Sequence, residues 1–204
     1  MKYGHASNHS SAILETAKER DIHWLIMGNR GSSRVRSFFL GSTASSVLEI
    51  TDIPVLLINV YPGKVEKIRS EIMERYTQRA LIHLLHPTDF SGASEKAFYV
   101  MKHLIAQKTK SVTFIHVADK RENHLKQLKE LASSLSYPDH LKVNLKMPGG
   151  NPDKEILNEI DHSKVTLVVM GTRGRGYKQR KFRESISYRV AAQCKTPILF
   201  VPYK

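Results

Sequence analysis

The chain has 204 residues, enough for one large domain or two small ones, and its 41% hydrophobic and 25% charged residues are usual for a globular protein. A formal net charge of +13 permits nucleic acid, anionic membranes or phosphorylated ligands as partners and does not choose among them. No apolar run approaches the roughly 18 residues of a membrane span, and the N-terminus lacks the apolar core of a signal peptide, so we expect a cytoplasmic protein without a membrane partner.

The first part of the chain alternates between helical and extended patterns. Residues 1–7 are predicted to be the end of a strand. Residues 8–20 predict a helix, because Ile13, Leu14 and Ala17 fall on one face. A strand, a helix and a second strand are predicted next, at 22–27, 42–51 and 54–60.

A complete series of strands and helices is predicted from Arg79 onward. The Tyr61-Pro62-Gly63 break and an amphipathic linker helix over 64–77 separate it from the first part. Five strands are predicted, at 80–85, 111–117, 141–147, 165–170 and 197–202. The predicted helices lie at 92–107, 121–135, 152–162 and 185–194. This alternation implies right-handed crossovers and an α/β fold, with a parallel sheet covered by helices on both faces.

An internal repeat relates the two parts of the chain. An offset of 143 residues places residues 1–60 on 144–203 without a gap, so that Met27-Gly28 falls on Met170-Gly171. Residues 79–143 have no counterpart before the first copy. We therefore expect the back half of one unit, a linker and one complete unit, at 1–60, 61–78 and 79–204.

Each copy carries a glycine-containing loop between a buried strand and the start of a helix. The loop positions are Gly28, Gly31, Gly41 and Ser42 in the first copy and Gly171, Gly174, Glu184 and Ser185 in the second. Glycines let the backbone approach phosphates, and free N–H groups at a helix start attract anions. Glu184 instead adds bulk and negative charge, among basic residues of the 173–183 segment that either clamp a polyphosphate or pair with the glutamate.

The spacing Gly, two residues, Gly, nine residues, Gly, then Ser or Thr resembles the signature of the universal stress proteins, and the resemblance covers nearly the whole chain. It implies a five-stranded parallel sheet in the order 3-2-1-4-5, units that pair through their last strands, and a partial second copy of the same unit. The Pro87-Thr88-Asp89 turn resembles the family turn whose aspartate contacts the adenosine of bound ATP, and Val117 resembles the residue that lies against adenine.

The resemblance therefore implies ATP or AMP as the cofactor of the complete unit. The implied binding residues are Pro87, Thr88, Asp89, Val117, Met170, Gly171, Arg173, Gly174, Ser185 and Ile186. A second tier, in the incomplete copy, comprises Gly28, Gly31, Gly41 and Ser42.

The first copy lacks the first two strands that the resemblance implies, so residues 1–7 have no neighbour in their own sheet. Three explanations stand: a truncated or interrupted gene, a missing piece supplied by another chain, or a remnant held by the second unit. We favour truncation as the origin. In the present structure we expect residues 54–60 to pair with 197–202, within the chain or in a homodimer, and the N-terminal residues to be poorly anchored.

Several of these residues also have ordinary structural roles. Asp89 precedes a helix, where aspartate caps free N–H groups, and this role is compatible with an adenosine contact. His83 and His86 fall on opposite faces of a strand, and the remaining histidines show no ligand spacing, so no metal site is predicted. Cys194, the single cysteine, excludes an intrachain disulfide framework and is expected to be a packed helix residue.

The sequence thus predicts a regulatory or stress-response module that binds ATP or AMP in residues 79–204. No catalytic constellation or Walker sequence is recognisable, so we expect at most weak ATP hydrolysis. Two alternatives are a stress protein that acts by dimerisation without a nucleotide, and a binder of polyanions or nucleic acid through the basic 173–183 segment. The lack of an aromatic stacking motif beside that segment argues against nucleic acid.

Overall fold

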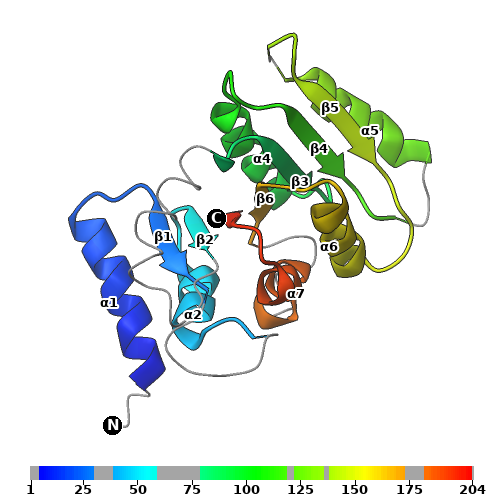
Figure 1. Cartoon of the computed structure of the whole chain (residues 1–204). Helices are drawn as coiled ribbons and strands as arrows, with labels where there is room; N and C mark the ends of the chain where they lie inside the picture. Colours follow the sequence, from blue (N-terminus) through cyan, green and yellow to red (C-terminus); the bar gives the residue numbers. More distant parts are fainter. Residues whose placement is uncertain are drawn as a thin grey trace.

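The structure is a computed structural model that describes residues 5–29, 39–58, 79–118, 122–135, 138–172 and 182–203. Seven strands in these ranges form one sheet, ordered β1-β2-β7-β6-β3-β4-β5 (Figure 1). Their bounds are β1 (Leu25–Gly28), β2 (Val55–Ile58), β3 (His83–Pro87), β4 (Ser111–Ile115), β5 (Lys142–Lys146), β6 (Leu167–Gly171) and β7 (Ile198–Val201). All neighbouring strands run parallel except β2 and β7.

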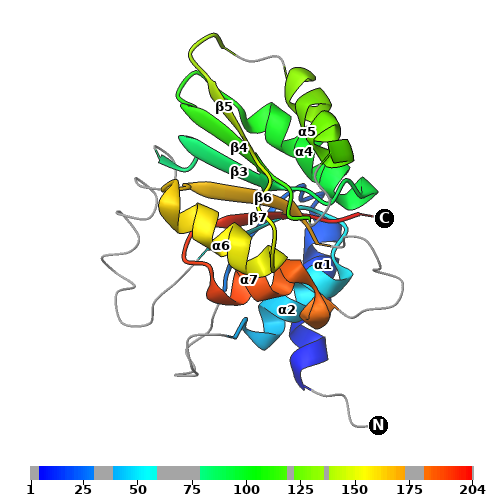
Figure 2. The same ribbon diagram turned by 90° about the vertical axis from the view of Figure 1, so that its right-hand side faces the viewer.

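Helices cover the sheet unevenly (Figure 2). The helices are α1 (His5–Glu19), α2 (Ser42–Ile50), α4 (Gly92–Leu104), α5 (Glu122–Ser133), α6 (Pro152–His162) and α7 (Ile186–Gln193), with a 3₁₀ turn, η2 (Phe182–Glu184). The helices α1, α2, α6 and α7 lie on one face, and α4 and α5 lie on the other, over the strands of the second copy. The helices of the first face extend over the strands of both copies and leave a groove beside β5, whereas the described helices on the other face cover only part of it.

The alternation of side chains along the strands divides the core in two. In β6, Val168 and Met170 join the core beneath α6 and α7, and Leu167 and Val169 join the core beneath α4. Both sets are buried, because a parallel strand between two helical layers has no solvent-facing side. This explains why β6 is a continuous apolar run in the sequence.

The two copies are joined through their last strands. Antiparallel pairing sets Val55 opposite Phe200 and Leu57 opposite Ile198. The expected pairing of 54–60 with 197–202 is thus present within the chain, while residues 59 and 60 lie outside the described part. Because β2 is bonded to β1 and β7, and β7 to β2 and β6, both edges of each strand are occupied. A homodimer through these same edges is therefore unavailable in this arrangement.

The structure corrects several boundaries. Residues 5–7 begin α1 and are not the end of a strand, because a strand with no neighbour would leave its backbone groups unpaired, whereas a helix pairs them internally. The strands predicted at 22–27 and 80–85 begin later than expected, at Leu25 and His83. The strands form one seven-stranded mixed sheet, in which β5-β4-β3-β6-β7 stand in the order 3-2-1-4-5 and β2 and β1 extend the sheet beyond β7. The expected linker helix at 64–77 lies outside the described residues.

Candidate functional site

The carboxyl end of β3 leads into a tight turn that starts α4. Oδ1 of Asp89 accepts hydrogen bonds from the Ser91 backbone N–H (3.0 Å) and hydroxyl (2.5 Å). Ser91, and not Asp89, is the N-cap of α4, since its hydroxyl accepts from the Ser94 backbone N–H at 3.4 Å. The carboxylate therefore orients the cap residue and does not cap the helix directly. Thr88 closes the turn by accepting from the Phe90 backbone N–H at 3.0 Å.

Phe90 adopts a left-handed backbone conformation with φ of 56°. For a bulky side chain this conformation costs about 1–3 kcal/mol and is found preferentially at functional sites. Its ring packs on His116 and His124, with centroids 4.7 and 5.8 Å away. Nδ1 of His116 lies 2.7 Å from the carbonyl oxygen of Thr88, which connects this aromatic cluster to the turn. None of these three residues is among the predicted binding residues, and the only sequence signal for them is the aromatic position directly after Asp89.

The carboxyl end of β4 lies beside the same turn. The Thr88 backbone N–H donates to the Ile115 carbonyl at 2.9 Å, in continuation of the parallel pairing of Pro87 with Ile115. Val117 follows β4 by two residues, is half-buried, and packs against the core beneath α6 and α7. The Ala118 backbone N–H donates to the Pro148 carbonyl at 3.3 Å, beyond β5. The structure thus brings three of the predicted residues, Pro87, Thr88 and Val117, to one end of the sheet.

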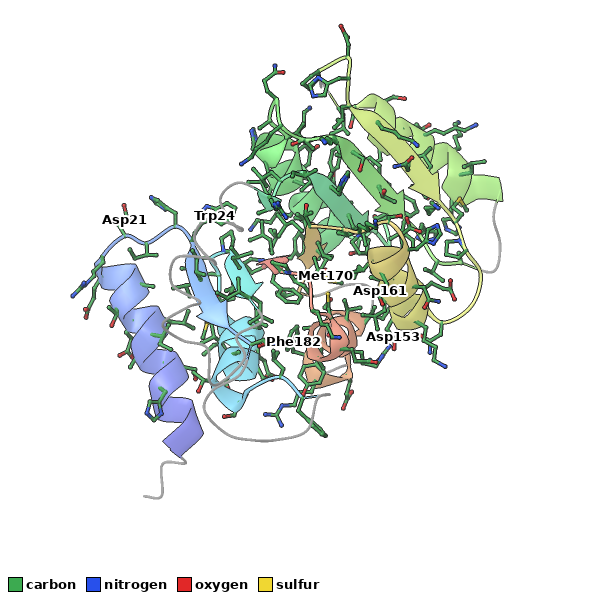
Figure 3. The ribbon with its side chains drawn as sticks, in the orientation of Figure 1. Asp21, Trp24, Asp153, Asp161, Met170 and Phe182 are labelled. Atoms are coloured by element: carbon green, nitrogen blue, oxygen red, sulfur yellow. The ribbon has the colours of Figure 1, made fainter. Side chains whose placement is uncertain are left out.

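The end of β6 completes this arrangement. Met170 is buried in the core beneath α6 and α7 (Figure 3). A Cβ atom on Gly171 would lie 2.8 Å from the Ala93 carbonyl oxygen, so glycine is required here for β6 to pass the start of α4. Packing within the protein therefore explains Gly171 without a ligand. The following residue, Thr172, was not predicted; its hydroxyl is buried and has no hydrogen-bond partner among the described residues.

The helix α7 begins at the second-copy loop. Ser185 is its N-cap, since its hydroxyl accepts from the Tyr188 backbone N–H at 3.0 Å and donates to the Phe182 carbonyl at 2.6 Å. Ile186 is the first residue of the helix and is partly exposed. The Glu184 side chain is exposed, and its carbonyl oxygen accepts from Nη1 of Arg189 at 3.0 Å. The rest of the loop, including Arg173 and Gly174, lies outside the described residues.

The third glycine of the first-copy loop, Gly41, has an ordinary backbone conformation. Gly41 is the N-cap of α2, with φ of −56° and ψ of 145°, a conformation that any residue adopts. Backbone strain therefore does not require glycine at this position, and Glu184 occupies the matching position of the second copy without a positive φ. Gly28 ends β1 and Ser42 opens α2, whereas Gly31 falls outside the described part of the chain.

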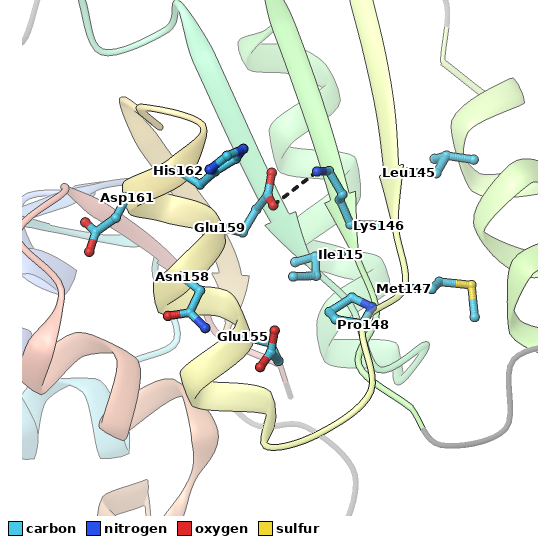
Figure 4. A pocket seen from close by; sticks show the side chains of 10 residues that line it. All are labelled: Ile115, Leu145, Lys146, Met147, Pro148, Glu155, Asn158, Glu159, Asp161 and His162. Carbon is cyan, nitrogen blue, oxygen red and sulfur yellow. Dashed lines mark ion pairs between the residues drawn. The ribbon is translucent and has the colours of Figure 1, made fainter.

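A groove of about 840 Å³ lies between β5 and α6, next to the ends of β4 and β5 (Figure 4). Ile115 and Pro148 form one side of it, and α6 contributes Glu155, Asn158, Glu159, Asp161 and His162. Nζ of Lys146 lies 3.5 Å from Oε2 of Glu159. The groove is therefore predominantly acidic, and it lies on the same face of the sheet as Val117.

Two titratable groups, the Cys194 thiol and the His86 ring, have pKa values that are shifted by burial. Burial raises the pKa of the Cys194 thiol to about 11, and Sγ donates to the Thr196 carbonyl at 3.3 Å. The cysteine follows α7 as its C-cap and is not a residue of the helix. Burial lowers the pKa of His86 to about 4, while Nδ1 lies 2.8 Å from the Val169 carbonyl oxygen. Within the described ranges, no group of three or more His, Cys, Asp or Glu side chains is arranged to hold a metal ion.

The fold is that of an α/β protein in which a mostly parallel sheet lies between helices and candidate residues gather at the carboxyl ends of its strands. The model of the universal stress protein family matches residues 4–59 and 120–202, well over half of the sequence. The chain belongs to the universal stress protein family. None of the helices that the structure describes is long and apolar enough to cross a bilayer.

Solved structures show the same fold. A universal stress protein from Archaeoglobus fulgidus DSM 4304 is 21% identical, with a TM-score of 0.70 over 95% of this chain, which spans 66% of that protein. A putative universal stress protein from Pseudomonas aeruginosa UCBPP-PA14 is 14% identical, with a TM-score of 0.63 over 98% of this chain and 69% of that one. The hypothetical protein MJ0577 is 26% identical, with a TM-score of 0.53 over 61% of this chain and 98% of its own. The search of curated proteins found no match.

Proposed function

We propose that residues 79–204 bind an adenine nucleotide, ATP or AMP, at the carboxyl ends of β3, β4 and β6, and that the protein is a cytoplasmic regulator of a stress response. One observation carries the proposal: the Asp89 turn, Val117 and the buried hydroxyl of Thr172 lie at neighbouring strand ends. Ligands of open α/β sheets bind at this position, where the strand order reverses. Here the order reverses between β3 and β6.

The residues suit the parts of a nucleotide. Val117 offers an apolar surface to the base. The Asp89 carboxylate is of the acceptor type that binds ribose hydroxyls. The start of α7 at Ser185 presents backbone N–H groups toward the phosphates. Arg173 and the other basic residues of that loop supply positive charge, and the strain at Phe90 is consistent with a turn shaped for a ligand.

No general base for hydrolysis is assigned, and the proposed role is regulation by nucleotide binding. Glu184 lies where the first copy has Gly41, and its negative charge opposes a phosphate next to Ser185. We therefore expect residues 79–204 to bind ATP more weakly than a site whose loop has all three glycines. Polyanion binding through the 173–183 segment is the alternative, and it would weaken steeply between low and physiological salt.

The test is ATP binding to Asp89→Ala, measured by calorimetry. Loss of a hydrogen bond to a charged group costs about 1.5–3 kcal/mol, so we expect affinity to fall by about 10-fold to 100-fold. Ser91→Ala is the matched control, because it removes the α4 cap and the hydroxyl contact with Asp89 but keeps the carboxylate and its hydrogen bond from the residue 91 backbone N–H. We expect Ser91→Ala to lower the melting temperature and to bind ATP with affinity much closer to wild type. An unchanged affinity in Asp89→Ala would remove Asp89 from the site.

A further inference from the structure

We propose that the outer edge of β1, with the apolar surface on both of its sides, binds a β-strand followed by an amphipathic helix that a partner polypeptide supplies. The chemistry of that partner is given by residues 83–104 of this chain, the strand β3 and the helix α4. In the complete unit, residues 79–204, these two elements occupy the equivalent place, beside and over β6. This inference does not depend on nucleotide binding.

The first support is the pairing of the strands. The internal repeat places β1 on β6. The strand β6 is bonded to β7 on one side and to β3, in parallel, on the other. Among the described strands, β1 is bonded to β2 alone. Its outer edge thus corresponds to the edge of β6 that β3 occupies, and an edge strand with unpaired N–H and C=O groups is a template for another strand.

The second support is the face that α4 covers in the second copy. Leu167 and Val169 of β6 are 4% and 0% exposed, and they share a core with Ala97 and Met101 of α4. Their counterparts in the first copy are Trp24 and Ile26, which are 44% and 68% exposed. Figure 3 labels Trp24 at this end of the sheet. No described helix covers these two side chains, whereas α4 covers the matching residues, Leu167 and Val169.

The third support lies on the opposite face of the same edge. A largely apolar groove of about 590 Å³ runs between α1 and β1 and includes Ile13, Ala17 and Leu25. The repeat places these residues on Ile156, Ile160 and Val168, which are buried in one core with Leu85 of β3. A docked strand would therefore direct alternate side chains into this groove and beneath its own helix, as β3 does.

A second copy of this chain fits the surface less well. Two β1 strands of four residues would pair edge to edge with few hydrogen bonds, and neither copy would bring a helix over Trp24 and Ile26. A strand–helix segment satisfies the edge and buries both apolar surfaces. The geometry of the second copy, in which β3 and α4 make these contacts with β6, specifies the parallel direction and the order of strand and helix.

The experiment uses Trp24, the only tryptophan of the chain, as the reporter in the full-length protein. The probe is a synthetic peptide with the sequence of residues 79–107. Binding should shift the Trp24 emission to shorter wavelength, saturate with peptide concentration, and reduce quenching by acrylamide. A control peptide with aspartate in place of Ala97 and Met101 should produce no shift, because its helix lacks the apolar face.

The protein variants separate this surface from the rest of the molecule. Ile26→Asp should weaken peptide binding by at least about tenfold, since charge at the centre of an apolar contact is costly. Ile50→Asp, at a 54% exposed position of α2 that is not among the residues lining the groove, should bind as wild type. Both positions are exposed, so circular dichroism should show folded proteins. A Trp24 signal that does not saturate, or equal binding by Ile26→Asp, would overturn the proposal. A shift that appears with protein concentration alone would identify a second copy as the occupant instead.

Discussion

Val169 and Ile26 occupy the same position of the internal repeat, and we predict that truncating them to alanine has very different effects on stability. Val169 is fully buried beneath α4, so Val169→Ala removes two carbons and leaves a cavity in a packed core. At about 0.8 kcal/mol for each buried carbon plus a cavity contribution, the expected loss is about 2–3 kcal/mol. Ile26 is 68% exposed, so removing its three outer carbons should cost about 0.8 kcal/mol or less.

Urea unfolding followed by circular dichroism measures both changes. With a slope of roughly 1–3 kcal/mol/M, Val169→Ala should lower the midpoint by about 1 M, while Ile26→Ala should shift it by a few tenths of that value. The slope itself should stay constant in both variants, so that the midpoint shifts report stability. Equal shifts would refute the reasoning, because they would mean that the first-copy face is as well covered as the second.

Two further predictions concern charge. Burial holds the pKa of His86 near 4 in the folded protein, against 6.5 in the unfolded chain. The contribution of this group to stability should therefore be constant above pH 6.5, and stability should fall by about 3 kcal/mol between pH 6.5 and 4. Urea midpoints at several pH values should show this slope. His86→Leu should flatten the slope and the exposed His103→Gln should keep it, and equal slopes in all three proteins would show that His86 is not the cause. Glu184→Gly should tighten ATP binding in calorimetry, with Glu184→Gln separating charge from bulk; if neither variant changes the affinity, the glutamate does not face the phosphates.

Local chemistry explains why much of the fold could be predicted from the sequence. Glycine positions, apolar runs and the period of amphipathic segments act over a few residues, and they located most of the helices and strands to within two or three positions. The repeat depends only on side-chain identity, so matching residues at an offset of 143 revealed it directly. The pairing of the last strands, which the resemblance to the universal stress proteins implied, is present as β2 and β7.

The candidate site was predictable only in outline. The sequence indicated that residues from several strand ends meet, because parallel strands end at one edge of the sheet. It did not indicate that Ser91 caps α4 while Asp89 orients it, that Phe90 adopts a positive φ, or that Thr172 is buried. Each of these features depends on neighbouring atoms that the linear spacing does not specify.

The sequence alone determined the repeat and the loop positions, and by these the matching strands of the two copies look alike. Tertiary structure decided how they differ. Gly171 is fixed by the backbone of Ala93 in α4, a residue far away in the sequence. Val169 is buried and Ile26 exposed for the same reason, since burial depends on which distant elements pack against a strand. Similar local patterns give similar strands, whereas β3 and α4 cover only one of them, and among the described strands β1 has a neighbour on one side alone.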